Sequence, residues 1–150
     1  MSLSINIEDP STVDGRTLIS GSEEALRAVY TADECFTFTA EELARPEISF
    51  FVARQQGAAL GCVALCDYKS YGEVKRLYVP EAGRGKGTAR ALMDVLERTA
   101  RDMGHSAVKL ETGEKLESAV ILYKKLGYTV CGPFGDYPDH PASLFMEKAL

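Results

Sequence analysis

The sequence predicts an α/β fold, a mixed β-sheet flanked by helices. Runs rich in β-branched and aromatic residues alternate with runs whose apolar residues recur at helical spacing, as in the succession 73–79, 85–103 and 107–112. Short connections between these runs are typical of parallel strands joined by a crossover helix. The 150 residues contain no internal repeat, low-complexity run or linker. We therefore expect a single domain over residues 1–150, with parallel strands at its centre.

The N-terminal third is expected to be mainly helical. We expect, in order, a strand at 4–8, helices at 11–20 and 22–30, and a helical turn at 39–43. Gly15 weakens the first helix because glycine has low helix propensity. Ser22 is a good start for the second, since its hydroxyl can cap free N–H groups and acidic residues follow it.

Strands and helices alternate in the rest of the chain. The expected strands are 48–55, 58–66, 73–79, 107–112, 128–131 and 143–147, and the expected helices are 85–103 and 116–126. Gln56 and Gly57 between the first two strands favour a hairpin turn. Gly104 and Gly127 are placed to end the two helices, Gly104 as a left-handed cap. The pattern predicts a mixed sheet overall.

Composition excludes several classes of function. The net charge of −5 argues against broad nucleic-acid binding, which needs a basic surface. No apolar run approaches the roughly 20 residues of a membrane span, so no membrane association is expected. No signal-peptide pattern opens the chain, which favours a cytoplasmic location.

The four cysteines do not form a metal-binding pattern. Cys35, Cys62, Cys66 and Cys131 include no CxxC pair, and only two histidines accompany them. We therefore expect no metal, and interpret the cysteines as small buried hydrophobic residues in a reducing compartment.

The chain is organised around the turn between the strand at 73–79 and the helix at 85–103. Gly83, Gly85 and Gly87 alternate there with Arg84 and Lys86. The first N–H groups of a helix lack partners within the helix, so such a turn is a candidate phosphate cradle. The spacing fits neither a P-loop nor a dinucleotide-binding fingerprint, because no Lys-Ser or Lys-Thr follows a glycine and the third glycine is missing.

The turn does carry the pattern R-x-x-G-x-A, formed by Arg84, Gly87 and Ala89. This segment resembles the acetyl-coenzyme A binding motif of the GCN5-related N-acetyltransferase (GNAT) superfamily, [QR]-x-x-G-x-[GA] after a strand. Downstream, the run 118–128, SAVILYKKLGY, is similar to the superfamily's A-x-x-L-Y-x-x-x-G-[FY] helix. The two motifs and their neighbouring strands cover about half of the chain, and the resemblance is to small bacterial members.

The resemblance implies that acetyl-CoA is the cosubstrate. It implies that the pantetheine arm pairs with the backbone of Leu77, Tyr78 and Val79. A backbone N–H of this strand would steady the thioester carbonyl. The pyrophosphate would contact the N–H groups of Arg84, Gly85, Lys86, Gly87, Thr88 and Ala89.

The resemblance also suggests catalytic residues. Tyr123 matches the tyrosine that protonates the departing thiolate in many members, although core packing would also explain an aromatic residue there. Glu73 matches the position of a general base in several members, and an exposed charge at a strand start is the alternative. Glu111, at the end of the next parallel strand, is a second candidate base because ligands gather at such strand ends.

Acceptor-binding residues are expected on the same sheet and in the C-terminal loop. Lys75 shares a face with Glu73 by strand alternation and suggests an acceptor carboxylate or an ion pair. Tyr137 and His140 are the expected contacts from the loop, which resembles that of a bacterial subgroup. Many members carry asparagine where this chain has Leu116, which weakens the expected cofactor contact from that helix.

These observations predict an acetyl-CoA-dependent N-acetyltransferase with a small amine or amino acid as acceptor. A protein N-terminal or lysine acetyltransferase is the alternative within this class. A coenzyme A-binding sensor without turnover is the alternative outside it. The resemblance also implies a possible homodimer. Acidic composition would suit a cationic acceptor, whereas Lys75 and Arg76 would suit an anionic one, so charge alone leaves the acceptor open.

Overall fold

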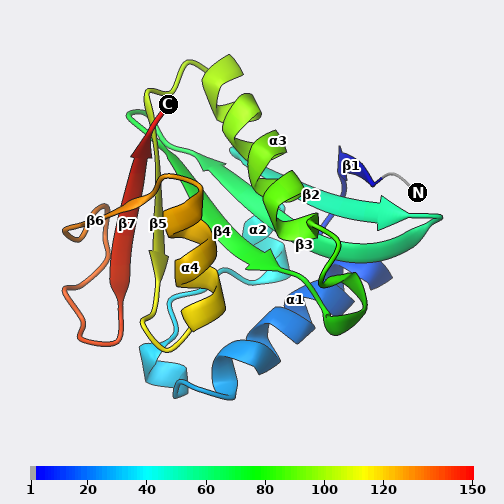
Figure 1. Cartoon of the computed structure of the whole chain (residues 1–150), viewed down its shortest axis with the longest axis horizontal. Coiled ribbons are helices and arrows are strands. Elements are labelled where there is room, and N and C mark those ends of the chain that lie inside the picture. Colours follow the sequence, from blue (N-terminus) through cyan, green and yellow to red (C-terminus); the bar gives the residue numbers. More distant parts are fainter. Residues whose placement is uncertain (1–2) are drawn as a thin grey trace.

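The structure, a computed structural model, describes residues 3–150 and shows one seven-stranded sheet with helices on both faces (Figure 1). The strands are β1 (Ser4–Ile7), β2 (Ile48–Gln55), β3 (Ala58–Asp67), β4 (Gly72–Tyr78), β5 (Ala107–Thr112), β6 (Thr129–Cys131) and β7 (Leu144–Ala149). The helices are α1 (Val13–Arg27), α2 (Ala40–Leu43), α3 (Thr88–Asp102) and α4 (Glu117–Lys125), with short 3-10 turns η1 (Ala32–Glu34) and η2 (Glu81–Gly83). The predicted α/β class is confirmed.

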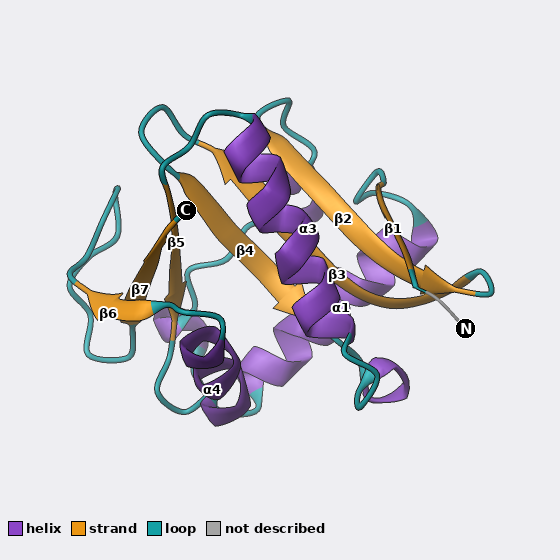
Figure 2. Cartoon of the chain, turned by 45° about the horizontal axis from the view of Figure 1, so that its top comes forward, coloured by secondary structure: helices purple, strands orange, loops and turns teal. Residues whose placement is uncertain are grey.

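The sheet is mixed, as expected, and its strand order is β1-β2-β3-β4-β5-β7-β6. The pairing of β4 with β5 is parallel, and the other neighbouring strands pair antiparallel. The parallel register joins Gly72 to Val108 and ends where Val74 pairs with Leu110. Beyond this point the two strands diverge (Figure 2). The edge of β4 from Lys75 onward therefore has no neighbouring strand on the β5 side.

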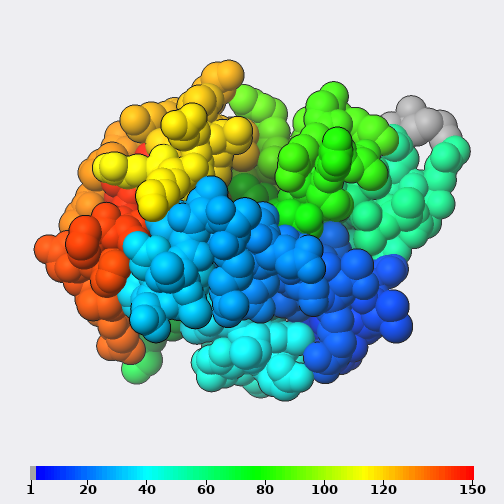
Figure 3. Space-filling model, turned by 90° about the horizontal axis from the view of Figure 1, so that it is seen from below, coloured from blue at the N-terminus to red at the C-terminus, as the bar shows by residue number. Residues whose placement is uncertain are grey.

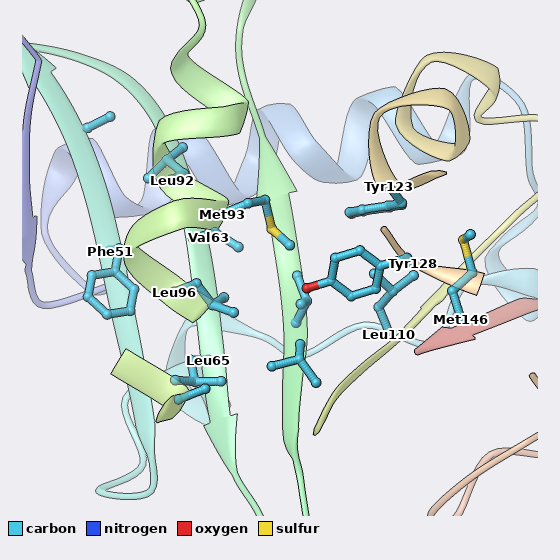
Figure 4. Packing of buried hydrophobic residues seen from close by; sticks show 14 residues of the cluster. Phe51, Val63, Leu65, Leu92, Met93, Leu96, Leu110, Tyr123, Tyr128 and Met146 are labelled. Carbon is cyan, nitrogen blue, oxygen red and sulfur yellow. The ribbon is translucent and has the colours of Figure 1, made fainter. Parts of the chain in front are cut away.

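Two hydrophobic clusters hold the helices on opposite faces of this sheet. Under α3 and α4, the cluster includes Leu92, Met93, Leu96 and Tyr123 together with strand residues such as Val63 (Figure 4). The other cluster packs α1 and α2 against β2 and β3 and includes Leu18, Leu43, Phe50, Val52 and Ala64. Burial of these side chains stabilises the layers, with roughly 25 cal/mol for each Å² of apolar surface removed from water.

The prediction of two helices at 11–20 and 22–30 is wrong, because α1 runs unbroken from Val13 to Arg27. Thr12 rather than Ser22 caps it, accepting a hydrogen bond from the Gly15 amide at 3.0 Å. Ser22 is buried inside the helix. A methyl group at Gly21 would lie 2.7 Å from the Tyr78 hydroxyl oxygen. The glycine therefore allows a close approach of α1 to β4 and does not interrupt the helix.

The turn predictions are largely confirmed. Gln56 and Gly57 have φ of +52° and +82°, the paired positive angles of a tight hairpin turn between β2 and β3. Gly104 and Gly127 also have positive φ and follow α3 and α4 closely. The start of α3 differs from the expected residue 85, because the helix begins at Thr88 with left-handed Gly87 as its cap.

The cysteine interpretation holds for only two of the four side chains. Cys62 and Cys66 are buried in β3, whereas Cys35 and Cys131 are half-buried, and all four are free thiols. Over residues 3–150, no group of three or more His, Cys, Asp or Glu side chains is arranged to hold a metal ion. In the same residues, no helix has the length and apolar character required to cross a bilayer.

Candidate active site

A cavity of about 190 Å³ lies where β4 and β5 diverge. Its floor is the free edge of β4 and the end of β5, and its walls come from α1, the segment 34–38, α4 and the C-terminal loop. Viewed from below, the surface is hollowed between the green of α3 and the yellow of α4 (Figure 3). The residues that line the cavity and enter the argument are Leu26, Glu34, Cys35, Phe36, Phe38, Lys75, Leu77, Tyr78, Glu111, Leu116, Tyr123 and Tyr137.

A bulge in β4 shapes the floor of the cavity. Arg76 has φ of +55°, unusual for a residue with a side chain, and the β3–β4 register shifts between Cys62 and Ala64. The Arg76 guanidinium donates to the Phe38 carbonyl at 3.1 and 3.2 Å and to the Ser22 hydroxyl at 3.3 Å. Arg76 therefore ties the segment 34–38 and α1 to the sheet. It is not the free cation that the sequence suggested, because its guanidinium is already bonded within the protein.

Glu73 is buried with 2% of its surface exposed, so an exposed charge at the strand start is excluded. Its Oε2 accepts a hydrogen bond from the Tyr137 hydroxyl at 2.5 Å and lies 3.2 Å from the Lys75 Nζ. Burial raises the pKa of this carboxyl, while the charge of Lys75 and the bond from Tyr137 lower it. Lys75 and Tyr137 line the cavity and Glu73 lies behind them.

Glu111 lines the cavity directly, at the end of β5. Its Oε2 accepts a hydrogen bond from the Ser143 hydroxyl at 2.7 Å. Burial raises the pKa of Glu111 to about 7, against the lowering effects of the Ser143 bond and of Lys75. A carboxyl with this pKa changes protonation state near neutral pH, which suits a general base.

Tyr123 projects from α4 to the cavity and is 6% exposed. Its ring packs edge-on against Tyr128, with ring centroids 5.7 Å apart (Figure 4). Among the described residues, the Tyr123 hydroxyl has no hydrogen-bond partner. Every side-chain oxygen that is fully buried there does have a partner, so the Tyr123 oxygen is not fully buried. The hydroxyl is therefore accessible from the cavity. Burial raises the pKa of the Tyr123 phenol above its usual value.

Tyr128 is fixed from behind by a buried polar cluster. Its hydroxyl donates to Glu97 Oε2 at 2.9 Å, and the Lys148 ammonium donates to Glu97 Oε1 at 2.7 Å. Glu97 lies on α3 and is 6% exposed. The cluster connects α3 to the end of α4 and to β7, and it supports the ring against which Tyr123 packs.

Aromatic side chains surround the Lys75 ammonium. Its Nζ lies 4.2 Å from the ring centroid of Phe38 and 4.8 Å from that of Tyr137, and it also donates to the Tyr137 hydroxyl. His140 does not line the cavity, since its Nδ1 accepts from the Ala142 amide at 3.0 Å and its ring packs on Phe36. The structure therefore brings Lys75, Glu111 and Tyr137 to the cavity, with His140 beside it.

Sequence reasoning missed the aromatic segment between η1 and α2. Phe36 and Phe38 line the cavity, as do Glu34 and Cys35. The alternation of phenylalanine and threonine at 36–39, in a region without strand pairing, is the signal that could have identified it. Contacts with residues distant in sequence, among them Arg76, Lys75 and Tyr137, give the segment its place.

The glycine-rich turn presents a series of free amides. The amide of Arg84 already donates to the Glu81 carbonyl at 3.1 Å, which corrects its place in the predicted cradle. Gly85 and Gly87 have φ of +73° and +75°. From Gly85 to Arg90, no amide has a protein acceptor among the described residues, and α3 has no side-chain cap. These amides, with the positive end of α3, form a site that suits a diphosphate.

Leu116 occupies the cap position of α4, where it makes no side-chain hydrogen bond and instead lines the cavity. Asparagine at this position could offer a polar contact, whereas leucine offers apolar surface. The departure from the superfamily pattern therefore changes the chemistry of the cavity wall and leaves the phosphate turn unaltered.

Comparison with known proteins gives a consistent result. The model of the Acetyltransferase (GNAT) family matches residues 16–128. An IAA acetyltransferase of Azospirillum brasilense is 41% identical over 135 residues, covering 89% of this chain and 88% of the relative. The uncharacterized N-acetyltransferase YsnE of Bacillus subtilis is 31% identical, covering 97% of this chain and 99% of that protein.

Solved structures share the fold over the whole chain. A crystal structure described as an acyl-CoA N-acyltransferase of Klebsiella pneumoniae superposes with a TM-score of 0.84 at 27% identity, covering 99% of this chain and 97% of that one. The PaiA N-acetyltransferase of Thermoplasma acidophilum, solved in complex with coenzyme A, shares the fold with a TM-score of 0.74 at 18% identity, covering 100% of each chain. The chain therefore belongs to the GNAT family of acetyltransferases, enzymes that use acetyl-CoA as the acetyl donor.

Proposed function

We propose that this enzyme transfers the acetyl group of acetyl-CoA directly to the amine of a small molecule bound in the same cavity. The observation that carries the proposal is the position of Glu111, a carboxyl with a pKa of about 7 that faces a small cavity beside the free edge of β4. An alkylammonium must lose a proton before it can attack a thioester, and Glu111 is suited to accept that proton.

The donor would bind along the free edge of β4 and across the glycine turn. Leu77 and Tyr78 line the cavity at the end of β4, and Val79 follows towards η2. A pantetheine arm has amide groups that can pair with such an edge as an added strand does. The amides from Gly85 to Ala89 would then bind the pyrophosphate, and Lys86 would contribute positive charge.

The transfer step requires three proton movements. Glu111 first accepts the ammonium proton, directly or through water, and the neutral amine then bonds to the acetyl carbon. As the carbon–sulfur bond breaks, Tyr123 donates its phenolic proton to the departing sulfur, and the second proton that the nitrogen loses in forming the amide returns to the Tyr123 oxygen. Burial raises the pKa of Tyr123, but it also raises thiol pKa values, as with Cys62 at about 12 in this protein. Burial would therefore raise the pKa of the proton donor and that of the departing thiol in the same direction.

Glu73 has a different place in this proposal. Its carboxylate is engaged by Tyr137 and Lys75 and lies behind the cavity wall. It would orient these two side chains, and direct contact with the amine would be left to Glu111. This assignment exchanges the order of the two candidates that the sequence suggested.

The two alternative functions, a protein acetyltransferase and a coenzyme A sensor, require different properties of the site. A protein N-terminal or lysine acetyltransferase would need a path for a polypeptide, whereas a cavity of about 190 Å³ favours a small acceptor. A coenzyme A sensor would bind the donor without turnover. The relative from Azospirillum brasilense, named as an IAA acetyltransferase, supports a small-molecule acceptor.

The test is release of free coenzyme A from acetyl-CoA in the presence of small amines, amino acids, and peptides with free N-termini or lysines. The proposal predicts acceptor-dependent thiol release and an acetylated small molecule identified by mass spectrometry. Release with peptides alone would favour a protein acetyltransferase. Tight coenzyme A binding without release for any acceptor would favour the sensor.

A further inference from the structure

The acceptor end of the cavity contains two oppositely charged groups on its floor. Lys75 comes from β4 and Glu111 from β5, and both line the cavity just beyond the last parallel pair of Val74 and Leu110. Because Lys75 and Glu111 directly follow the paired residues Val74 and Leu110 of two parallel strands, their side chains project from the same face of the sheet. An acceptor bound here would meet a cation and a carboxyl together.

The Lys75 ammonium retains a donor for a ligand. An ammonium group has three N–H donors. In the described part of the chain, the partners of Nζ are the Glu73 carboxylate at 3.2 Å and the Tyr137 hydroxyl. Lys75 is only 8% exposed, so bulk water has little access to the third donor. A buried donor without an acceptor is costly, and a ligand oxygen in the cavity would remove that cost.

The position of Lys75 is fixed before any ligand arrives. The rings of Phe38 and Tyr137 flank its Nζ at 4.2 and 4.8 Å from their centroids. The Phe38 carbonyl is in turn held by Arg76. A pre-positioned ammonium loses little further entropy on binding, so a contact with a ligand carboxylate would contribute strongly to recognition.

The remaining wall is mainly apolar. Leu26, Cys35, Phe36 and Phe38 line it from α1 and the segment 34–38. Glu34 of this segment also lines it, but its Oε1 already accepts a hydrogen bond from the Thr31 amide at 2.9 Å. Apolar walls with a few convergent polar groups are typical of small-ligand sites. They favour a side chain without charge and disfavour a second cation, which Lys75 would also repel.

We propose that the acceptor is a free α-amino acid with an apolar side chain, whose carboxylate binds the Lys75 ammonium while its amine faces Glu111. The side chain lies against Phe36 and Phe38. The α-amine gives one proton to Glu111 and bonds to the acetyl carbon, the carbon–sulfur bond breaks, and the sulfur takes a proton from Tyr123, whose oxygen regains the second proton of the nitrogen. The products are an N-acetyl amino acid and free coenzyme A. This inference rests on the proposed acetyl transfer and narrows its acceptor.

The first test compares acceptors that share a side chain and differ in the carboxylate. For leucine, methionine and phenylalanine, kcat/KM is measured for the free amino acid, its primary amide and the corresponding decarboxylated amine, with putrescine as a diamine. We expect the amino acid to exceed both counterparts by roughly 10- to 100-fold, the range for a charge-assisted hydrogen bond. The amide has the less basic amine, so it would be the better acceptor if the carboxylate contributed nothing.

The second test asks whether Lys75 is the source of the preference. In Lys75→Met, the ratio of kcat/KM for amino acid over amide should fall to near one, because a ratio is insensitive to a general loss of active enzyme. The double variant Glu73→Gln/Lys75→Met avoids leaving Glu73 without its cation and should show the same loss. Lys109→Met is the matched control, since Lys109 pairs with Glu147 and lies outside the cavity lining. It should keep the wild-type ratio.

The outcomes separate this inference from the proposed function. Acetylation of amines or diamines at least as fast as of amino acids would overturn the inference and leave small-molecule acetyl transfer intact. A preference for amino acids that persists in both Lys75 variants would overturn the role of Lys75. If neither amino acids nor amines are acetylated, the proposed function fails, and this inference fails with it.

Discussion

The hydroxyl of Ser143 donates a 2.7 Å hydrogen bond to the Glu111 carboxylate, joining the start of the last strand to the candidate base. This bond lowers the pKa of Glu111, while burial raises it to about 7. Burial and this bond are the two largest influences on the pH at which the carboxyl can accept a proton, and the charges of Lys75 and Glu73 add smaller, opposite ones.

Replacement of Ser143 tests this relationship. In Ser143→Ala the lowering effect is lost, so the pKa of Glu111 rises and the acid limb of kcat/KM moves to higher pH, by roughly one unit. Activity at pH 7 should fall while activity at pH 9 changes little. Ser143→Thr keeps a hydroxyl and should stay close to wild type. A limb that remains in place in Ser143→Ala would show that this bond does not tune the base.

Glu111→Gln removes the candidate base itself. We expect kcat to fall by about 10² to 10⁴, with loss of the limb near pH 7. Glu73→Gln is the comparison variant, because Glu73 does not line the cavity and the limb should persist. The limb should move to lower pH in that variant, since the charge of Glu73 contributes to the raised pKa of Glu111. Retention of the limb in Glu111→Gln and its loss in Glu73→Gln would reverse the assignment.

The Glu111 carboxyl should also make the free energy of unfolding depend on pH. A pKa raised in the folded state means that folded protein binds more protons than unfolded protein between about pH 4.5 and 7. The contribution of Glu111 to the free energy of unfolding is therefore full below this range and decreases as pH rises through it. Chemical denaturation at several pH values should show this decrease in wild type and a flatter dependence in Glu111→Gln. Equal slopes would contradict the raised pKa.

Tyr123→Phe removes one hydroxyl and keeps the ring that packs on Tyr128. If the phenol protonates the departing sulfur, kcat should fall by at least tenfold. The melting temperature should change little, because the hydroxyl has no partner in the described chain. Stopped-flow detection of thiol release would measure the step. Unchanged turnover with unchanged stability would leave Tyr123 a packing residue only.

The glycine turn can be tested through its backbone angles. Gly87→Ala places a side chain at φ of +75°, where open space surrounds the added carbon, so its cost of roughly 1 to 2 kcal/mol is backbone strain. Relief of that strain would displace the amides that follow, and coenzyme A affinity measured by calorimetry should fall several-fold. Gly87→Asn should retain more affinity because asparagine tolerates this conformation.

A second glycine provides the control for this experiment. Gly57 in the β2–β3 hairpin has φ of +82° and equally open surroundings. Gly57→Ala should lower stability in the same way and leave coenzyme A affinity unchanged. Equal losses of affinity in both variants would indicate a global effect, and the turn would then have no demonstrated role in donor binding.

The sequence predicted the sheet elements well because strand periodicity and glycine-bounded turns are local signals. It divided α1 in two, because Gly15 weakens the helix and because Ser22, followed by acidic residues, resembles a helix start. Gly15 lies under the Pro10 carbonyl, and Gly21 lies under Tyr78 from a distant strand. Tertiary contacts of this kind override helix propensity and leave no local trace.

The candidate site was predictable to the extent that it follows the motifs and strand alternation. Lys75 and Glu73 were expected on one face and form an ion pair. Their burial was not predictable, because it depends on Tyr137 folding back from the C-terminal loop. Phe38 likewise lies near Lys75 because Arg76 binds the Phe38 carbonyl. No sequence pattern predicts the positive φ of Arg76.

The main chain at Arg76 adopts a left-handed bend inside a strand, and the hydrogen bonds to the Phe38 carbonyl help to hold it there. Residues 34–38, which would contact the proposed acceptor, therefore also support the strand along which the donor would bind. Replacement of residues 34–38 by those of a relative would therefore change the conformation of β4 as well as the acceptor specificity. If the new segment offered no carbonyl to Arg76, the bend in β4 would lose its hydrogen bonds and the strand would straighten. The binding site for the donor would then be disrupted together with that for the acceptor.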